Sequence, residues 1–264
     1  MVCLGSRVCF RSGGILAVNL MSPQLLAVIP ARGGSKRIPR KNIKDFLGKP
    51  LIAYSIDTAL QSGLFADVIV STDDQEIADV AQKCGAKVPF MRSAELANDF
   101  AGTGAVGADA FKRMEALGHK YDGLCILYAT APLLTVEHLR KAYNSFAQDK
   151  ADYLFSCCEF PFPIQRGFYH DADGTPIPVM PQYQMARSQD LAKAYQDAGQ
   201  FYFKSPRFID FELQNPDIYN TPQIKDFTLR CYEMPRYRVI DIDTPEDWEY
   251  ALVLANAIKT MQQA

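Results

Sequence analysis

The sequence predicts an α/β fold in which helices flank a mostly parallel sheet, and three observations support this. From residue 25 onward, short β-branched runs alternate with longer helical patterns, as they do in βαβ units. A basic, glycine-rich segment directly follows the first of these runs. Near residue 160 the alternation stops and prolines become frequent. We therefore expect a Rossmann-like sheet that carries a small inserted lobe at about residues 160–198.

The first part of the chain predicts alternating strands and helices with recognisable boundaries. Pro50 suits the first turn of a helix and Gly63 its end, and Asp73 or Asp74 can cap the next helix, which ends near Gly85. Gly118 is the expected stop of a further helix. The expected strands are 25–29, 67–71, 87–90, 123–128 and 153–158, and the expected helices are 51–62, 74–84, 104–117 and 136–147.

The second part begins with the proline-rich excursion. The segment 171–174 (DADG) is a turn signal and predicts a hairpin inside the lobe. After it we expect strands at 200–203, 227–232 and 238–242, followed by a final helix that starts at Pro245.

Size and charge restrict the class of protein. The 264 residues are enough for one domain with a full core, which we place at 21–264 after an unstructured extension at 1–20. A net charge of −2 argues against binding nucleic acid or an anionic membrane through a whole-protein field, and no run reaches the about 18 apolar residues of a membrane span. Seven cysteines without a CxxC pair indicate reduced thiols, so we expect a cytoplasmic protein.

The loop after the first strand carries the most specific signal. Its segment 32–41 concentrates five cations at the carboxyl end of a strand, where α/β proteins bind phosphates. Gly33 and Gly34 would let backbone N–H groups turn toward an anion, while Arg32 and Lys36 add charge. The alternative is a solvated basic turn.

A dinucleotide fingerprint at Gly102-Thr-Gly104-Ala-Val-Gly107 is interpreted as a decoy. A Rossmann fingerprint needs a strand immediately before it, and residues 95–101 do not form one. We expect a helix start at this point, with the Thr103 hydroxyl at the positive end of the helix.

Asp241 and Asp243 stand two residues apart in a run expected to be a strand, so their side chains should share one face. Two adjacent carboxylates suit Mg²⁺, which fills its other positions with water and substrate phosphates. The alternative is that Asp243 or Thr244 only caps the helix that follows.

Three segments together resemble the CMP-nonulosonic (CMP-sialic) acid synthetases, a cytidylyltransferase family of the nucleotide-diphospho-sugar transferase type. They are 30–42 (PARGGSKRIPRKN), 92–97 (RSAELA) and 241–245 (DIDTP), and the resemblance covers about residues 25–255. Two further stretches, 195–203 and 235–250, resemble the branch that activates pseudaminic acid.

The resemblance implies CTP and a nine-carbon keto sugar acid as substrates, Mg²⁺ as cofactor, pyrophosphate release, and a homodimer paired through the lobe. By resemblance, the nucleotide-binding residues are Ala31, Arg32, Gly33, Gly34, Ser35, Lys36, Asn42, Arg92 and Thr103. The resemblance also implies Arg32, Lys41 and Asp243 as catalytic residues and Asp241 and Asp243 as metal ligands. The sugar-binding residues that it implies are Tyr128, Arg187 and Gln200.

Departures from the family keep other functions open. Tyr128 stands where sialic acid enzymes carry Gln, which favours pseudaminic acid over N-acetylneuraminic acid, and Arg37 stands where they usually have Gly. A CMP-N-acetylneuraminate or CMP-legionaminate synthetase remains an alternative. A glycosyltransferase that binds metal through Asp-x-Asp and a non-catalytic nucleotide sensor are the alternatives from other classes.

Overall fold

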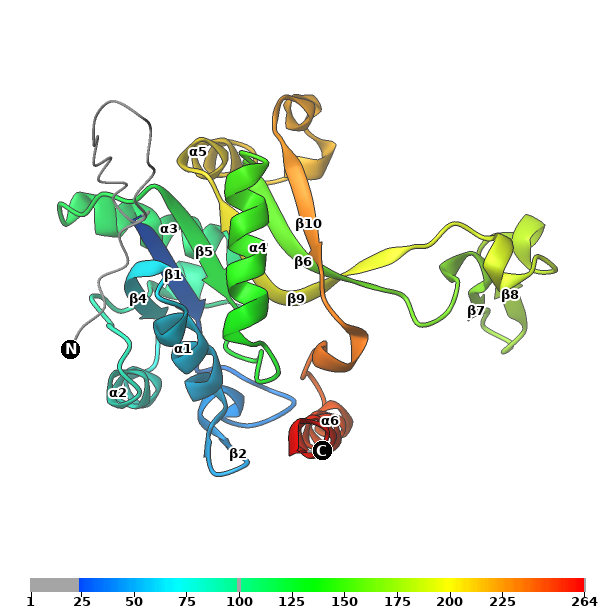
Figure 1. Ribbon diagram of the computed structural model, residues 1–264, viewed down its shortest axis with the longest axis horizontal. Helices are drawn as coiled ribbons and strands as arrows, with labels where there is room; N and C mark the ends of the chain where they lie inside the picture. The colour runs from blue at the N-terminus through cyan, green and yellow to red at the C-terminus, as the bar shows by residue number, and fades with distance from the viewer. Residues whose placement is uncertain (1–23, 99–100, 264) are drawn as a thin grey trace, which may run out of the picture.

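The computed structural model describes residues 24–98 and 101–263, so the predicted extension at 1–20 lies outside the described residues. Its centre is a six-stranded sheet (Figure 1). In spatial order the strands are β10 (Leu229–Glu233), β6 (Tyr153–Glu159), β9 (Tyr195–Lys204), β5 (Gly123–Leu127), β1 (Leu25–Pro30) and β4 (Phe65–Ser71). Only β9 runs against the other strands of this sheet, being antiparallel to both β5 and β6. The predicted mostly parallel α/β fold is confirmed.

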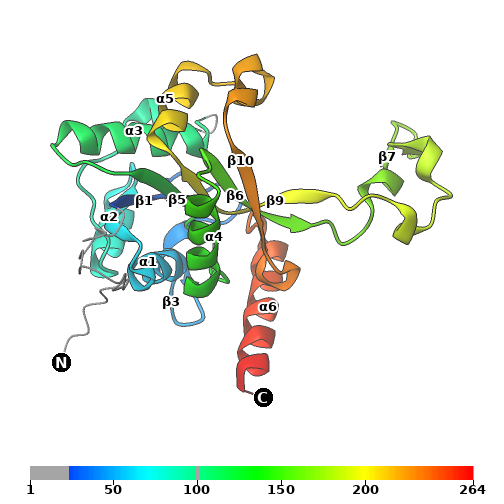
Figure 2. The ribbon, with the colours of Figure 1, turned by 45° about the horizontal axis from the view of Figure 1, so that its top comes forward.

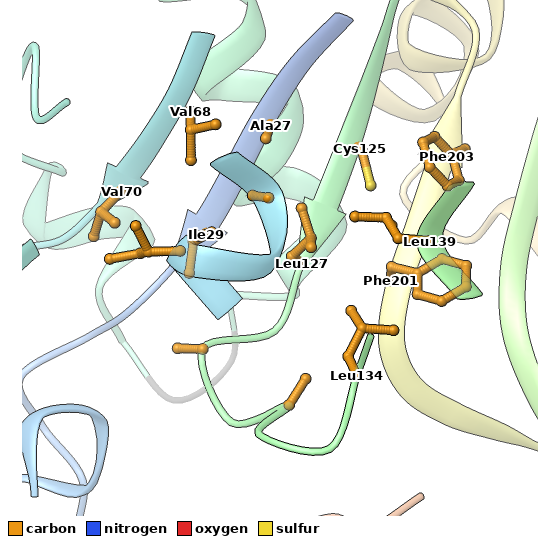
Figure 3. Packing of buried hydrophobic residues seen from close by; sticks show 14 of the residues in the cluster. Ala27, Ile29, Val68, Val70, Cys125, Leu127, Leu134, Leu139, Phe201 and Phe203 are labelled. Atoms are coloured by element: carbon orange, nitrogen blue, oxygen red, sulfur yellow. The ribbon is translucent and has the colours of Figure 1, made fainter. Parts of the chain in front are cut away.

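Helices cover both faces of the sheet. One face carries α1 (Leu51–Ser62), α2 (Gln75–Lys83) and α4 (Val136–Gln148), and the other carries α3 (Thr103–Ala116) and α5 (Pro206–Gln214). Alternation along β1 explains this, because Ala27 and Ile29 belong to the first cluster while Leu26 and Val28 belong to the second. Figure 3 shows part of the first cluster, where strand side chains meet Leu139 of α4.

Local signals set the helix boundaries as predicted. Gly63 ends α1 with a φ of +64°, a conformation that glycine adopts without steric cost. The Asp74 carboxylate accepts a hydrogen bond from the backbone N–H of Ile77 and caps α2. Gly102 precedes α3 as its N-cap, so the dinucleotide fingerprint is a helix start.

Two predicted strands are wrong. In 87–90, only Lys87 makes a bridge, to Ile69 of β4. In 238–242, Arg236–Arg238 form a 3-10 helix and the following residues belong to no strand. Both runs have β-branched residues. Pro89 has no N–H with which to continue the pairing that Lys87 begins on β4, and 238–242 pairs with no strand of the sheet.

The last helix, α6 (Pro245–Gln263), packs against the small hairpin of β2 (Asp45–Phe46) and β3 (Lys49–Pro50). The Trp248 ring meets Phe46 edge-on, with centroids 5.4 Å apart, and Ile242 is buried in the same cluster. This packing brings the Asp241–Asp243 segment beside the first loop, although about 200 residues separate the two in sequence.

The predicted hairpin lobe leaves the sheet after β6 and returns through β9, and it extends well away from the body (Figures 1 and 2). It contains the antiparallel pair β7 (Phe168–His170) and β8 (Pro176–Pro178). The return strand begins at Tyr195, earlier than the predicted 200 and inside the range 160–198 predicted for the lobe. The 3-10 helices of the described chain are Lys41–Ile43, Ala94–Leu96, Ile164–Arg166, Pro181–Tyr183, Ser188–Asp190, Ile218–Asn220, Pro222–Asp226 and Arg236–Arg238.

In the described part of the chain, no helix has the length and apolar character that crossing a membrane requires. The five cysteines of that part are in no disulfide; Cys125, Cys157 and Cys158 are buried, and Cys231 is exposed.

Candidate active site

A cavity of about 470 Å³ opens at the carboxyl ends of β1 and β5, beside the start of α3. Nine of the residues selected from the sequence line it: Arg32, Ser35, Lys36, Lys41, Asn42, Arg92, Thr103, Tyr128 and Asp243. Arg37 lines it as well. The structure therefore brings the first loop, the start of α3, the end of β5 and the Asp motif to one place.

The charge of this cavity is strongly positive. Among the described residues, five cationic side chains line it, from Arg32, Lys36, Arg37, Lys41 and Arg92, against one carboxylate, that of Asp243. Cations gathered in a concave site attract a polyanion and neutralise charge that develops on it. This arrangement suits the binding of a triphosphate. It argues against the alternative interpretation of the loop as a solvated basic turn.

Two side chains hold the loop in place, and one of them, Asp73, was not assigned to the site from the sequence. Asn42, which is buried, donates from Nδ2 to the carbonyl oxygen of Arg32 at 3.1 Å. The N–H of Gly33 donates to Oδ1 of Asp73 at 3.0 Å. The sequence offered a weak signal for this contact, because Asp73 follows β4 at the same edge of the sheet.

The predicted backbone anion nest is thus corrected. The Gly33 N–H is bound to Asp73, and the N–H of Ala31, which is buried, donates to Ser71 in β4. Neither glycine lies among the cavity-lining residues, so the groups that this cavity offers to an anion are the cationic side chains. Glycine is needed at position 33 because the backbone passes close to the side chain of Asp74, and a Cβ there would lie 2.7 Å from Oδ2 of Asp74.

Asp74 anchors the far side of the loop. Its carboxylate receives two hydrogen bonds from the guanidinium of Arg40, which also pairs with Glu76. The bonds from Arg40, together with those from the first turn of α2, lower the pKa of Asp74 to about 2. Arg40 is therefore turned toward α2 and does not line the cavity.

Asp243 connects the two motifs. Lys41 donates to the carbonyl oxygen of Ile242 and, at 3.1 Å, to Oδ1 of Asp243, while Arg37 donates to Oδ2 at 2.6 Å. Although burial alone would raise it, the hydrogen bonds and charges of Lys41 and Arg37 lower the pKa of Asp243. The Arg37 pair is largely exposed, and such a pair adds little stability and can be exchanged for a ligand.

Asp241 differs from Asp243. It does not line the cavity, and it is not on a strand, so the predicted shared strand face is wrong. Partial desolvation and the neighbouring Asp243 carboxylate raise the pKa of Asp241. Thr244 caps α6, as the alternative predicted. Its Oγ1 accepts from the N–H of Asp247 at 3.2 Å, and the Asp247 carboxylate accepts from the N–H groups of Asp243 and Thr244.

The donor set at this point fits a hard divalent cation. The Asp243 carboxylate lines the cationic cavity and raises the pKa of the nearby Asp241, and Mg²⁺ commonly takes one or two carboxylates together with phosphate oxygens and water. Within residues 24–98 and 101–263, no group of three His, Cys, Asp or Glu side chains forms a metal cage, so phosphate oxygens would have to complete the coordination.

The deep wall is formed by Arg92, Thr103 and Tyr128. Arg92 is buried, donates to the side chain and carbonyl oxygen of Ser71, and has a pKa lowered by burial. Thr103 stands at the first position of α3, as predicted, with Oγ1 3.3 Å from the hydroxyl of Tyr128. A donor wall of this kind can orient a base or a sugar by hydrogen bonds.

Two predicted sugar-binding residues are not brought to the cavity. Arg187 lies in the lobe, with 71% of its side chain exposed and an ion pair to Asp190. Gln200 is buried in β9 and does not line the cavity.

Comparisons with known proteins relate the chain to one enzyme family. The family model for cytidylyltransferases matches residues 26–263. The chain is 47% identical, over 87% of its length and 95% of the relative, to the pseudaminic acid cytidylyltransferase of Campylobacter jejuni subsp. jejuni serotype O:2. It is 33% identical to the CMP-N,N'-diacetyllegionaminic acid synthase of Legionella pneumophila, over 85% of its length and 93% of the relative. Among solved structures, CMP:2-keto-3-deoxy-manno-octonic acid synthetase complexed with CTP has a TM-score of 0.67 at 20% identity, covering 89% of this chain and 99% of that one, which shows a shared fold.

Proposed function

The chain belongs to the cytidylyltransferase family, and on this premise we propose that it couples CTP to pseudaminic acid, forming CMP-pseudaminic acid and pyrophosphate. The observation that carries the proposal is the cavity wall of loop cations facing Asp243 at the carboxyl end of β1. Family membership sets aside the glycosyltransferase and the nucleotide sensor considered from the sequence.

The reaction is a substitution at the α-phosphorus of CTP. The anomeric hydroxyl of the sugar acid forms the new P–O bond, the bond to the bridging oxygen breaks, and pyrophosphate leaves with that electron pair. The hydroxyl proton passes to solvent. Positioning and charge neutralisation supply most of the catalysis in such a step.

The chain's own residues divide this work by their place in the cavity. Arg32, Ser35 and Lys36 hold the phosphates that depart, where negative charge accumulates. Lys41 holds Asp243 in place, and Arg37 can exchange its exposed pair with Asp243 for a phosphate oxygen. Asn42 holds the backbone of the loop in position through its hydrogen bond to the Arg32 carbonyl oxygen.

Asp241 and Asp243 would hold Mg²⁺. The chemistry that a bound Mg²⁺ supplies is neutralisation of phosphate charge and a lowered pKa for a coordinated hydroxyl. The fit rests on the like-charged pair beside the cavity.

The test is pyrophosphate release from CTP with Mg²⁺, with pseudaminic, N,N'-diacetyllegionaminic and N-acetylneuraminic acids in parallel. Release with pseudaminic acid at a kcat/KM at least tenfold above the other two is expected, and EDTA should abolish it. Preference for another sugar acid would overturn the substrate assignment but leave the reaction class intact. Absence of release with all three would overturn the proposal.

The lobe is proposed to join two copies of the chain. It exposes large apolar side chains, including Phe168 and Tyr169 on β7 and Met185, which is 96% exposed. Exposed apolar groups concentrated in one projecting segment are typical of an interface. Since Arg187 stands in this lobe and away from its own cavity, a partner's cavity is where it would meet the sugar acid.

We expect a solution mass of twice the chain's 29.5 kDa at micromolar concentration, measured by light scattering after gel filtration. Met185→Glu should shift the population to monomer, because it places a charge in the apolar surface. Met261→Glu, a matched change at an exposed methionine of α6, should leave the dimer intact. A monomeric wild-type protein would rule out the interface.

A further inference from the structure

The return strand β9 contains an irregularity beside the cavity. In the β6–β9 ladder, Phe155 pairs with Tyr202 and Cys157 pairs with Asp197, so Ser156 alone spans the stretch 198–201 of β9. The Ser156 hydroxyl accepts from the N–H groups of Gln200 and Phe201 at 3.1 and 3.2 Å. Bulges of this kind redirect side chains next to functional sites.

Asp197 shapes the turn of this bulge. Its Oδ1 accepts the N–H of Gly199 at 2.8 Å, and Gly199 has a φ of +59°. A Cβ on Gly199 would lie 3.5 Å from the ring of Tyr128, so the bulge rests directly on a residue that lines the cavity.

The Asp197 carboxylate also holds Tyr202. The Tyr202 hydroxyl lies 2.9 and 3.0 Å from the two carboxylate oxygens and 3.4 Å from the hydroxyl of Tyr128. A phenol has one proton, and the charged carboxylate is the stronger acceptor. Burial, together with the neighbouring Tyr128 and Asp197, raises the pKa of Tyr202, so this proton stays in place at neutral pH.

The β9 bulge next to Tyr128 therefore presents acceptors, whereas the first loop presents donors; Asp197 and Gln200 lie behind Tyr128 and are not among the residues that line the cavity. Asp197 is exposed to solvent and its carboxylate has lone pairs left for a ligand. Gln200 on the same bulge is 1% exposed, and its Oε1 has no hydrogen-bond partner in the described structure. An unsatisfied buried acceptor costs free energy unless a ligand or water supplies a donor.

We infer that Asp197, presented by the β9 bulge and held by Tyr202, is a specificity-determining residue that accepts an amide N–H from an acetamido group of the sugar acid. The inference rests on the proposed function. It identifies Asp197 as the hydrogen-bond partner of a polar substituent of the sugar acid near Tyr128. The buried Gln200 lies on the same bulge and adds a second acceptor, its Oε1. An acceptor-only carboxylate favours substrates with N–H or O–H donors at this position over analogues that lack them.

Asp197→Asn tests the inference, because asparagine keeps the size and an oxygen for the Gly199 N–H but loses the charge. The KM for pseudaminic acid should rise about tenfold or more. The KM for CTP should stay within twofold of wild type, as should kcat. Tyr202→Phe, which frees Asp197 without removing it, should raise the same KM by a smaller factor.

The control is Asp149→Asn, which removes an exposed carboxylate at the end of α4 that pairs with Arg230 of β10 and does not line the cavity. It should change neither KM, and the thermal midpoints of all three variants should agree within a few degrees. An unchanged KM for the sugar acid in Asp197→Asn, or equal rises in both KM values, would overturn the inference while leaving the proposed function standing. A wild-type protein that releases no pyrophosphate with any acetamido sugar acid would instead overturn both.

Discussion

Asp243→Asn is expected to lower kcat for pyrophosphate release by roughly 10²–10³-fold at saturating CTP and Mg²⁺. The Asp243 carboxylate lines the cavity, and its two oxygens face the Lys41 ammonium and the Arg37 guanidinium. Asparagine keeps the size of the side chain but removes the charge that these groups and a divalent cation would share. The fold should persist, because the contact of Asp243 with α6 is made by its backbone N–H to Asp247.

The matched control is Asp57→Asn. Asp57 on α1 is exposed to the same degree as Asp243 and is also paired with a lysine, Lys49, but it does not line the cavity. Its kcat should remain within twofold of wild type. Binding of Mn²⁺, followed by electron paramagnetic resonance with CTP present, should weaken in Asp243→Asn alone. An Asp243→Asn enzyme that keeps more than a third of wild-type kcat would show that this carboxylate has no part in the reaction.

Lys41→Met is expected to reduce kcat/KM for CTP by roughly 10²-fold, the second largest effect. The Lys41 side chain is 17% exposed and bridges the first loop to the Ile242 carbonyl and the Asp243 carboxylate. Methionine preserves the length and the apolar stem but leaves both oxygens without their donor. The loop then keeps only the exposed Arg37 bond to Asp243, and Asp241 and Asp243 lose one of the two cations that offset their charge.

Steady-state kinetics with CTP varied measures this effect, and Lys41→Arg should recover part of it because it restores the charge. Combining Lys41→Met with Asp243→Asn gives a double-mutant cycle. The two losses should fall short of additive, since each change removes the same contact. Fully additive losses would mean that the two residues act on separate parts of the reaction.

Several features of the fold could be predicted because they depend on local chemistry. The alternation of β-branched runs with helical patterns indicated a mostly parallel sheet, and Gly63 and Asp74 mark helix boundaries through their own backbone and side-chain preferences. The basic loop after the first strand could be placed at the carboxyl edge, because in a parallel sheet that position follows from connectivity.

The errors share a different cause. The run 238–242 has the residues of a strand but finds no neighbouring edge, and its carboxylates reach the first loop only through the packing of Trp248 on Phe46. The backbone of Gly33 was expected to bind an anion, but Asp73 from the next strand binds it first. Each of these outcomes depends on a partner that lies far away in sequence.

The sequence by itself thus determined the α/β class and the cationic loop, because periodicity, capping and strand connectivity are local properties. Its resemblance to the CMP-sialic acid synthetases pointed to several further residues that gather in the cavity. Only the tertiary structure decided that β9 enters the sheet antiparallel, that its bulge presents Asp197 beside Tyr128, and that Arg187 stands apart in the lobe. Strand pairing and docking are set by the burial of surfaces from distant segments, which no local pattern contains.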